Sequence, residues 1–582
     1  MKKEARTSLK ILVLFILGIL ALHGHAFAQD KAKKVDELLS LYYKYGQFNG
    51  SALVADNGKV IFRKGFGLAN MEWNIPNEPD TKFRLGSLTK QFTATLILQL
   101  VEQNKINLEA KLSDYLPEYR KDTGSKVTIH NLLSHTSGIP SYTSVPGFFQ
   151  NISRNPFTVD DFIKKYASGD LEFEPGTKFT YSNSGYFILG AIIEKVTGKR
   201  YEQVLKENIF DPVGMKKSGY DHYGTIIDKR AAGYVKTPRG YENAPYLDMT
   251  IPYAAGSLYS TVEDLFIWDQ ALYENKILSA KSKELMFKPN LSDYGYGFVV
   301  TKATLGPNKT LVVPVIQHSG GINGFSTTIV RMVGEKRLVV LLDNTSQGRN
   351  LEAIARGIIS ILYDQPYETP KRSIAETLLQ TIVGKDVASA IKQYHDLKTN
   401  HSAEYDFRQM ELNTLGYQLL QMNKVVEAIE IFKLNVEAYP QVSNTYDSLG
   451  EAYMVHGNKE LAIWNYKKSL ELDPKNANAT SKLSSLTTER QEIKPADPRL
   501  YDTYAGDYEV VPSFIITITN EDSKLMAQAT GQPKFQLFPT SETEFSLKAV
   551  SAQITFVRDE QGQVVQLILN QNGRKTTAKK IR

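Results

Sequence analysis

Gly86-Ser87-Leu88-Thr89-Lys90 opens a helical pattern whose apolar positions are Phe92, Leu96, Leu100 and Val101. Ser87 and Lys90 lie three residues apart and share one face of such a helix, so the amine can reach the hydroxyl. A serine nucleophile with a lysine base needs this geometry. Gly86 permits a tight entry that exposes the hydroxyl and its backbone amide at the helix N-terminus. This stretch therefore predicts a nucleophile at the start of a helix.

The Ser-x-x-Lys spacing alone is not specific. Ser389-Ala390-Ile391-Lys392 has the same spacing within a segment of helical character, and we interpret this second copy as a solvated helix face. The sequence around Ser87 therefore has to decide the assignment.

Two motifs downstream of Ser87 have the composition of an active site. Tyr181-Ser182-Asn183 follows Pro175–Thr180, which predicts a turn and a short strand, and precedes a helix from about Ser184 to Gly198. Gln317-His318-Ser319-Gly320-Gly321 follows the strand-like Leu311–Ile316. Its small residues would let a substrate backbone lie against the edge of that strand.

These three motifs, in this order, resemble the serine β-lactamase and penicillin-binding-protein superfamily. Within it, the chain is similar to the class C β-lactamase-related branch, which includes D,D-peptidases and esterases. Three ancillary strings also resemble that branch: Leu132–Gly138, Ala255–Ser260 and Tyr294–Gly297. The resemblance covers roughly residues 34–363. It implies an α+β fold, in which a β-lactamase-like catalytic domain combines an antiparallel sheet, its helices and a helical subdomain.

The resemblance also implies a role for each motif residue. Ser87 resembles the acylated nucleophile, Lys90 the base that takes its proton, and Tyr181 the phenol that shuttles a proton to and from the leaving group. Asn183 resembles the amide that holds the substrate's acyl side chain. The predicted substrate-binding residues are Asn183, His318, Ser319, Gly320 and Gly321. The backbone amides of Ser87 and Gly321 would form the oxyanion hole.

His318 departs from the Lys-Thr-Gly motif of most β-lactamases, because it occupies the position of the lysine. A lysine is a permanent cation for a substrate carboxylate, whereas a histidine is only partly charged near neutral pH. Efficient β-lactam hydrolysis is therefore doubtful. His135, in one of the ancillary strings, is interpreted as a hydrogen-bonded structural residue.

Length and composition divide the remainder of the chain. The 582 residues suggest three or four domains, and the serine hydrolase domain is placed at residues 29–367. A polar break around Pro366 and Pro370 precedes a helical segment at residues 368–490. A small all-β domain at residues 498–582 follows, predicted as a meander or half-barrel.

The helical segment contains an internal repeat at residues 413–479. Six positions recur at one constant offset, among them Ala428 and Phe432, which recur as Ala462 and Tyr466. The small alanine lets two helices approach closely, and the aromatic residue fills the groove between them. The pattern resembles the tetratricopeptide repeat and has its period of about 34 residues. It implies either a groove for a protein or peptide partner or a structural spacer.

The N-terminal segment, residues 1–28, predicts a signal peptide. Four basic residues precede the apolar run Ile11–Leu22, and Ala26-Phe27-Ala28 has the small residues of a cleavage site. A run of twelve residues spans about 18 Å as a helix, short of the hydrocarbon core of about 30 Å, although a retained anchor is the alternative. The mature protein is expected to be exported, either periplasmic or secreted, after cleavage near Ala28.

Composition excludes several classes of function. The chain has no cysteine, which rules out disulfides, zinc–thiolate sites and a cysteine nucleophile. The segment 1–28 holds four of the 69 Lys and Arg and one of the 63 Asp and Glu, so the rest of the chain is nearly balanced and no nucleic-acid partner is indicated. No His-Glu-x-x-His string is present, and we expect neither a metal nor a cofactor.

The sequence therefore predicts an exported serine hydrolase acting through an acyl-enzyme. Its substrate would be a small molecule or peptide: an ester, a D-amino-acid amide or peptide, or, weakly, a β-lactam. Esterase and D,D-peptidase activity are not separated at this point. The alternative is a penicillin-binding or acylation sensor, or a partner-binding protein, with little turnover.

Overall fold

The computed structural model describes residues 29–237, 240–306, 309–487, 497–511, 514–547, 552–571 and 574–582. The predicted signal peptide lies outside these residues. No described helix is both long and apolar enough to cross a membrane. The chain forms two compact units, which divide between Met422 and Asn423.

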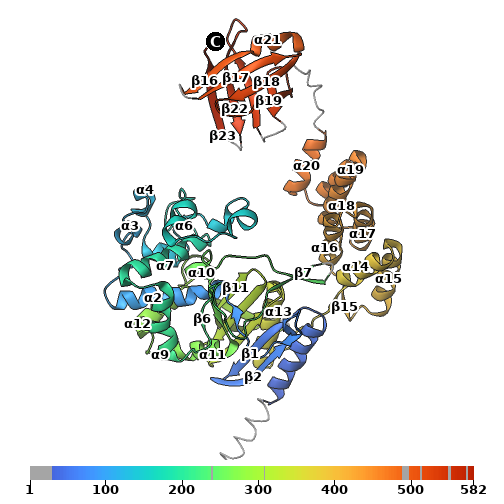
Figure 1. Cartoon of the computed structure of the whole chain (residues 1–582). Coiled ribbons are helices and arrows are strands. Elements are labelled where there is room, and N and C mark those ends of the chain that lie inside the picture. The colour runs from blue at the N-terminus through green and yellow to red at the C-terminus, as the bar shows by residue number, and fades with distance from the viewer. Residues whose placement is uncertain are drawn as a thin grey trace, which may run out of the picture. The chain divides into compact units, whose positions relative to one another are not determined.

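The first unit is built on a six-stranded antiparallel sheet with the order β10-β11-β12-β13-β1-β2. Its strands are β1 Gly50–Asp56, β2 Lys59–Phe66, β10 Val299–Leu305, β11 Leu311–Ile322, β12 Phe325–Met332 and β13 Arg337–Asp343. The two early strands, blue in Figure 1, thus lie beside strands from the far end of the catalytic region. This pairing joins the two ends of that region.

The centre of the sheet is buried on both faces, and the side chains of each strand alternate between the two faces. In β13, Leu338, Val340 and Leu342 pack into one apolar core, while Val339 and Leu341 pack into another. The second core includes residues of the helix over 29–44 and of α13 Gly348–Leu362. β13 is therefore almost continuously apolar.

The first core belongs to the helical part of the unit. α2 Thr89–Glu102 is buried around most of its circumference and packs against α7 Asn183–Thr197 and α10 Tyr253–Gly256. Other α-helices of this part are α3 Leu112–Tyr115, α4 Lys121–Gly124, α5 Ile129–Leu133, α6 Val159–Tyr166, α8 Tyr201–Leu205, α9 Asp211–Val213, α11 Val262–Ala271 and α12 Ala280–Phe287. The α+β architecture predicted from the sequence is confirmed.

Short strands complete the catalytic region outside the large sheet. They are β3 Leu68–Asn70, β4 Ile75–Pro76, β5 Phe83–Arg84, β6 Gly219–Tyr220, β7 Tyr234–Thr237, β8 Gly240–Asn243 and β9 Leu258–Ser260. β5, β9 and β6 form a three-stranded sheet, and β5 leads directly into the segment that carries Ser87.

The helical segment is divided between the two units. α14 Ile374–Gly384, α15 Val387–Asn400 and α16 Gln409–Gln421 belong to the first unit, and the two-residue strands β14 Arg372–Ser373 and β15 Tyr405–Asp406 pair within it. α17 Val425–Ala438, α18 Ser443–His456, α19 Lys459–Leu472 and α20 Ala477–Thr487 belong to the second.

The sequence repeat begins on α16 of the first unit and continues over α17, α18 and α19 of the second. Ala428, Phe432, Ala462 and Tyr466 are fully buried. A Cβ on Gly450 of α18 would lie 3.1 Å from the ring of Tyr466 on α19, so the two helices are in close contact there. The tetratricopeptide assignment and its partner stay predictions.

The C-terminal segment is a closed eight-stranded barrel, in which each strand pairs antiparallel with the next. The strands are β16 Gly506–Val511, β17 Phe514–Glu521, β18 Lys524–Ala529, β19 Phe535–Pro539, β20 Glu544–Leu547, β21 Ala552–Arg558, β22 Val564–Gln571 and β23 Arg574–Lys580. Pairing of β16 with β23, at Tyr508 and Lys580, closes it. The predicted meander order is confirmed, whereas the half-barrel is wrong, because the closing contact joins strands that local sequence patterns cannot connect.

Candidate active site

Lys90 is buried directly beneath Ser87. Ser87 lies in the 3₁₀ turn Gly86–Leu88, and Lys90 lies in the first turn of α2 that follows. The Lys90 Nζ atom is 3.1 Å from Ser87 Oγ, and Lys90 is 0% exposed. The predicted proximity of amine and hydroxyl is thus present. In the second Ser-x-x-Lys copy, Lys392 is exposed on α15.

Two further oxygens fix the amine of Lys90. Its Nζ lies 2.8 Å from Asn183 Oδ1, at the start of α7, and 2.8 Å from the carbonyl oxygen of Ala255 in α10. No carboxylate is among these hydrogen-bond partners. Burial therefore lowers the pKa of Lys90 well below its ordinary value, since a charged amine is poorly solvated there.

Tyr181 faces the same amine from the segment before α7. Its ring centroid lies 4.9 Å from Lys90 Nζ. Burial raises the pKa of the Tyr181 phenol, and a hydrogen bond with Ser87 partly opposes that rise. The phenol therefore keeps its proton at neutral pH. The short strand predicted before Tyr181 is wrong, because residues 177–182 have no regular secondary structure.

His135 makes three contacts with the segment at residues 180–182, which carries Tyr181. The backbone N–H of Thr180 donates to the His135 carbonyl oxygen at 3.0 Å, and the N–H of Ser182 donates to His135 Nδ1 at 3.1 Å. The imidazole lies against the Tyr181 ring, with centroids 4.2 Å apart. Burial, reinforced by Lys90 and His318, lowers the pKa of His135 well below its usual value. His135 is thus a neutral residue of the site, and its position in the Leu132–Gly138 string is the signal that could have indicated this.

The glycines of the first and third motifs allow two backbones to meet. Gly86 has φ +55°, and a Cβ there would lie 2.9 Å from the backbone nitrogen of Gly321. A Cβ on Gly320 would lie 2.0 Å from the carbonyl oxygen of Leu85. By contrast, no atom lies within 4 Å of a Cβ position on Gly321. Close approach thus places the Ser87 turn against the end of β11.

The strand edge expected at residues 318–322 is open. β10 pairs with β11 only as far as Gln317, whereas β12 pairs with β11 as far as Ile322. The last five residues of β11 therefore have a strand neighbour on one side only. Ser319 points away from the buried side, and its hydroxyl lies 3.2 Å from Thr328 Oγ1.

His318 is held neutral, contrary to the expected partial charge. Its Nδ1 lies 2.6 Å from the carbonyl oxygen of Ser319, which can only accept, so Nδ1 carries the proton. Nε2 then accepts from the hydroxyl of Tyr294 at 3.0 Å. Burial, reinforced by Lys90, lowers the pKa of His318 to about 4. The sequence pattern predicts no role for Tyr294, although this residue begins the Tyr294–Gly297 string.

A cavity of about 100 Å³ lies over Ser87. Ser87, Asn183 and Gly321 line it together with an apolar wall that includes Tyr142, Phe148, Phe149, Leu247, Ile251 and Ile322. Among the residues that the structure describes, no charged side chain lines it. The cavity suits an uncharged, apolar group next to the reacting carbonyl.

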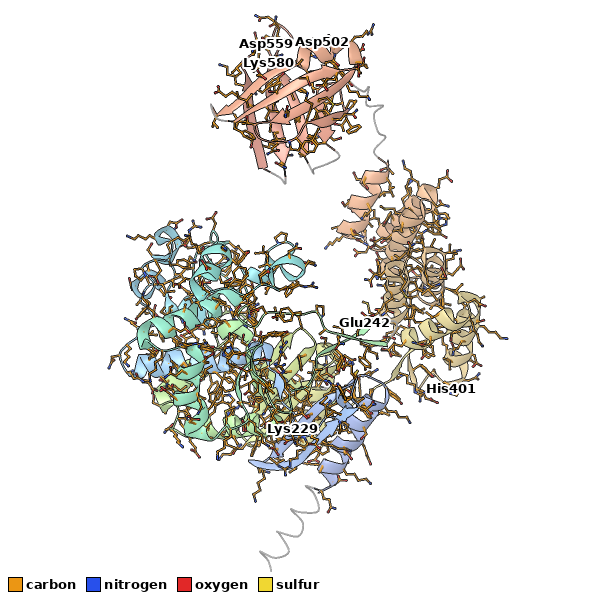
Figure 2. All side chains as sticks on the ribbon, viewed as in Figure 1. Lys229, Glu242, His401, Asp502, Asp559 and Lys580 are labelled. Carbon is orange, nitrogen blue, oxygen red and sulfur yellow. The ribbon has the colours of Figure 1, made fainter. Side chains whose placement is uncertain are left out.

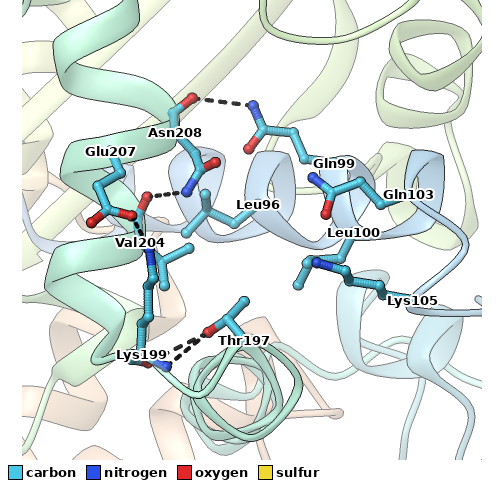
Figure 3. A pocket seen from close by; sticks show the side chains of 10 residues that line it. All are labelled: Leu96, Gln99, Leu100, Gln103, Lys105, Thr197, Lys199, Val204, Glu207 and Asn208. Atoms are coloured by element: carbon cyan, nitrogen blue, oxygen red, sulfur yellow. Dashed lines mark hydrogen bonds and ion pairs between the residues drawn. The ribbon is translucent and has the colours of Figure 1, made fainter.

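Another cavity, of about 160 Å³, lies at the C-terminal half of α2 (Figure 3). Gln99 donates to the carbonyl oxygen of Asn208 at 3.2 Å, and Lys199 pairs with Glu207 at 2.6 Å. None of the predicted site residues lines this cavity. It is separate from the site around Ser87.

Comparisons with known proteins agree with this geometry. Residues 32–362 match the sequence family described as Beta-lactamase, and residues 490–580 match the one described as "Domain of unknown function (DUF3471)". The chain is 34% identical to Penicillin-binding protein 4* of Bacillus subtilis (strain 168) over 368 residues, which cover 59% of this chain and 79% of that protein.

Two further relatives carry names that state an activity. The chain is 29% identical to Teichoic acid D-alanine hydrolase of Staphylococcus aureus (strain MRSA252), over 58% of this chain and 80% of that protein. It is 25% identical to D-amino acid amidase from Ochrobactrum anthropi SV3 in a crystal structure with L-phenylalanine. That similarity covers 58% of this chain and 99% of the amidase, with a TM-score of 0.50. The chain therefore belongs to the beta-lactamase family and is a serine hydrolase.

Proposed function

We propose that this chain is an exported hydrolase that forms an acyl-enzyme on Ser87 and acts on esters or D-amino-acid amides. The three contacts of Lys90 Nζ carry this proposal. The oxygens of Asn183 and Ala255 can only accept, so they take two N–H groups. A neutral amine has two N–H groups and one lone pair, and the lone pair is then left to face the Ser87 hydroxyl. The lowered pKa of Lys90 favours this neutral form.

In the acylation step, Ser87 Oγ attacks the substrate carbonyl carbon while its proton passes to Lys90 Nζ. The backbone amides of Ser87 and Gly321 stabilise the oxyanion that forms, which is typically worth about 3–4 kcal/mol per donor. The bond from carbon to the leaving group then breaks. Tyr181, protonated because its pKa is raised, donates its proton to the leaving alcohol or amine. Lys90 then passes its proton to the Tyr181 phenolate, which becomes a phenol again.

In the deacylation step, water attacks the Ser87 ester and yields the free acid. Lys90 Nζ lies 4.9 Å from the centroid of the Tyr181 ring, and in this proposal the two groups act as one proton-accepting pair that takes the proton of the water. Ser87 leaves with a proton returned from the same pair. The site therefore ends each cycle in its starting protonation state.

The uncharged cavity favours a neutral acyl group over a carboxylate-bearing one. Asn183 and the open edge at residues 319–321 offer hydrogen bonds, and neither they nor the neutral His318 supplies a cation. The relatives named D-alanine hydrolase and D-amino acid amidase support D-amino-acid esters and amides as the substrate class. A β-lactam would lack the cation it meets in most β-lactamases, so we expect slow hydrolysis.

Two parts of the proposal rest on the sequence alone. The basic start and the apolar run within residues 1–28 support export to the periplasm or the medium. The internal repeat supports a protein partner on the helices. A penicillin-binding or acylation sensor is the second candidate function, favoured by the likeness to Penicillin-binding protein 4*.

Burst kinetics on a neutral ester of an apolar D-amino acid test the proposal. We expect a burst equal to the enzyme concentration, followed by steady turnover, and neither in Ser87→Ala. A burst without later turnover would favour the sensor. Equal rates in the parent and Ser87→Ala would contradict both functions.

A further inference from the structure

A cavity of about 250 Å³ adjoins the catalytic cavity and contains two arginines. Both cavities are lined by Leu247 and Asn323. The Asn323 amide donates to the carbonyl oxygen of Pro245 at 2.8 Å and so fixes this shared wall. Arg84 and Arg230 lie in the lining of the larger cavity. The two guanidinium groups therefore lie in the cavity next to the one over Ser87.

The buried carboxylate of Asp221 accepts a hydrogen bond from each of the two arginines. Arg84 Nε donates to Asp221 Oδ2 at 2.7 Å, and Arg230 Nη1 donates to Asp221 Oδ1 at 2.7 Å. The Asp221 side chain is 0% exposed, whereas those of Arg84 and Arg230 are 16% and 29% exposed. Because a single negative charge faces two positive ones, this cluster retains one positive charge.

Most donor groups of the two arginines remain available. A guanidinium has five N–H groups in a planar fork, and Asp221 takes one from each arginine. Within the described residues, no other hydrogen bond leaves either guanidinium. Such forks match the oxygens of carboxylates and phosphates.

Of the other charged groups nearby, Lys229 is paired with carboxylates, whereas the carboxylates of Glu72 and Asp248 accept hydrogen bonds from neutral donors. Lys229, labelled in Figure 2, forms ion pairs with Glu78 at 3.2 Å and Asp80 at 2.8 Å. Asp248 accepts from Tyr246, which lines the cavity, and from Thr250, and Asp248 itself is not in the lining. No acidic side chain of the described residues therefore lines the cavity.

We propose that this cavity binds an anionic group, a carboxylate or a phosphate, carried by the substrate beyond its reacting acyl group. The inference rests on the proposed function, since it assumes that the substrate occupies the neighbouring cavity over Ser87. That cavity has no charged side chain among its described lining residues, and His318 is neutral. The pair Arg84 and Arg230 would then supply the recognition of anions that the third motif lacks.

Matched ester substrates test the proposal. Three ester substrates would share the same leaving group and differ only in their terminal group, which is a neutral amide, a carboxylate or a phosphate. In Arg230→Gln, which keeps the Arg84–Asp221 pair, we expect kcat/KM to fall about tenfold or more for the two anionic esters. It should stay unchanged for the neutral ester. A larger loss for one anion would identify which group the cavity accepts.

Two controls separate charge from structure. Arg63→Gln removes an exposed arginine of β2 that pairs with Glu263, and it should leave all three rates unchanged. Arg230→Lys keeps the charge without the fork and should retain part of the preference; it also serves if Arg230→Gln does not fold. An equal loss for neutral and anionic esters, or no loss for either anion, would overturn the proposal while leaving the role of Ser87 intact.

If no ester is hydrolysed, a thermal shift measures the site directly. Inorganic phosphate or acetate, compared with chloride at equal ionic strength, should raise the Tm of the full chain more than that of Arg230→Gln. Equal shifts in both proteins would contradict the anion site independently of the proposed function.

Discussion

The hydroxyl of Tyr294 lies 3.0 Å from Nε2 of His318, so Tyr294 is a direct hydrogen-bond partner of the third motif. The other ring nitrogen faces the carbonyl oxygen of Ser319. Each ring nitrogen of a neutral imidazole thus has a hydrogen-bond partner: Nδ1 donates and Nε2 accepts. A cation at this position would place two donors, the Tyr294 hydroxyl and the imidazolium, against each other unless the phenol rotates.

This contact predicts a flat pH dependence of substrate preference. The pKa of His318 is lowered to about 4, so the ring is uncharged throughout pH 5 to 8 and cannot lose a charge there. The ratio of kcat/KM for a carboxylate-bearing peptide to that for a neutral ester should therefore not fall through this residue's ordinary range, near 6.5. A ratio that drops severalfold around pH 6.5 and is flat in His318→Gln would show a charged His318.

The position of His135 predicts a loss that depends on the leaving group. His135→Phe keeps a ring against Tyr181 but removes the acceptor for the Ser182 N–H, whereas His135→Gln keeps an acceptor and removes the ring. Both changes should displace the phenol that protonates the leaving group. We expect kcat to fall roughly 10- to 100-fold for amides and alkyl esters and much less for nitrophenyl esters, which leave without a proton. Equal losses for both classes of substrate would mean that His135 supports only the fold.

The two glycines of the third motif predict different effects of an added methyl group on stability. A Cβ on Gly320 would lie 2.0 Å from the Leu85 carbonyl oxygen, so Gly320→Ala must shift the backbone beside Ser87. We expect it to lower the free energy of unfolding of the first unit by about 2 kcal/mol. Gly321→Ala adds the same group where no atom lies within 4 Å, and its Tm should match that of the parent in calorimetry. Similar Tm values for both variants would contradict the close approach of the two backbones.

The burial of Lys90 predicts the acidic limb of the pH profile. The reactive form is the neutral amine, and burial lowers its pKa, so activity persists at neutral pH and falls as pH drops through that lowered pKa. Lys90→Met fills a similar volume without a base and should reduce the acylation rate about 10²- to 10⁴-fold. Circular dichroism checks that the variant folds. An unchanged acidic limb in Lys90→Met would assign that limb to another group.

The candidate site residues can be selected from the sequence because they lie in three local motifs, and the structure brings these motifs together. The helix start at Ser87, the α2 pattern and the strand-like Leu311–Ile316 all follow from local periodicity. Contacts between distant segments have no such signal. Tyr294 meets His318, and His135 meets Tyr181, only because the fold brings four separate segments together.

The closed form of the C-terminal barrel also has no local sequence signal. Four apolar runs indicate β17, β19, β21 and β22, whereas the other four strands are shorter or more polar. Closure between Tyr508 and Lys580 depends on the register of all eight strands together. Local patterns therefore predict strands here but not their closed arrangement.

The most direct test of the central claim is intact-protein mass spectrometry after reaction with a serine-directed acylating probe. We predict one adduct per chain, located on Ser87, lost in Ser87→Ala and unchanged in Ser389→Ala, because Ser87, unlike Ser389, has a buried lysine amine 3.1 Å from its hydroxyl. Labelling that persists in Ser87→Ala would contradict the assignment of the nucleophile.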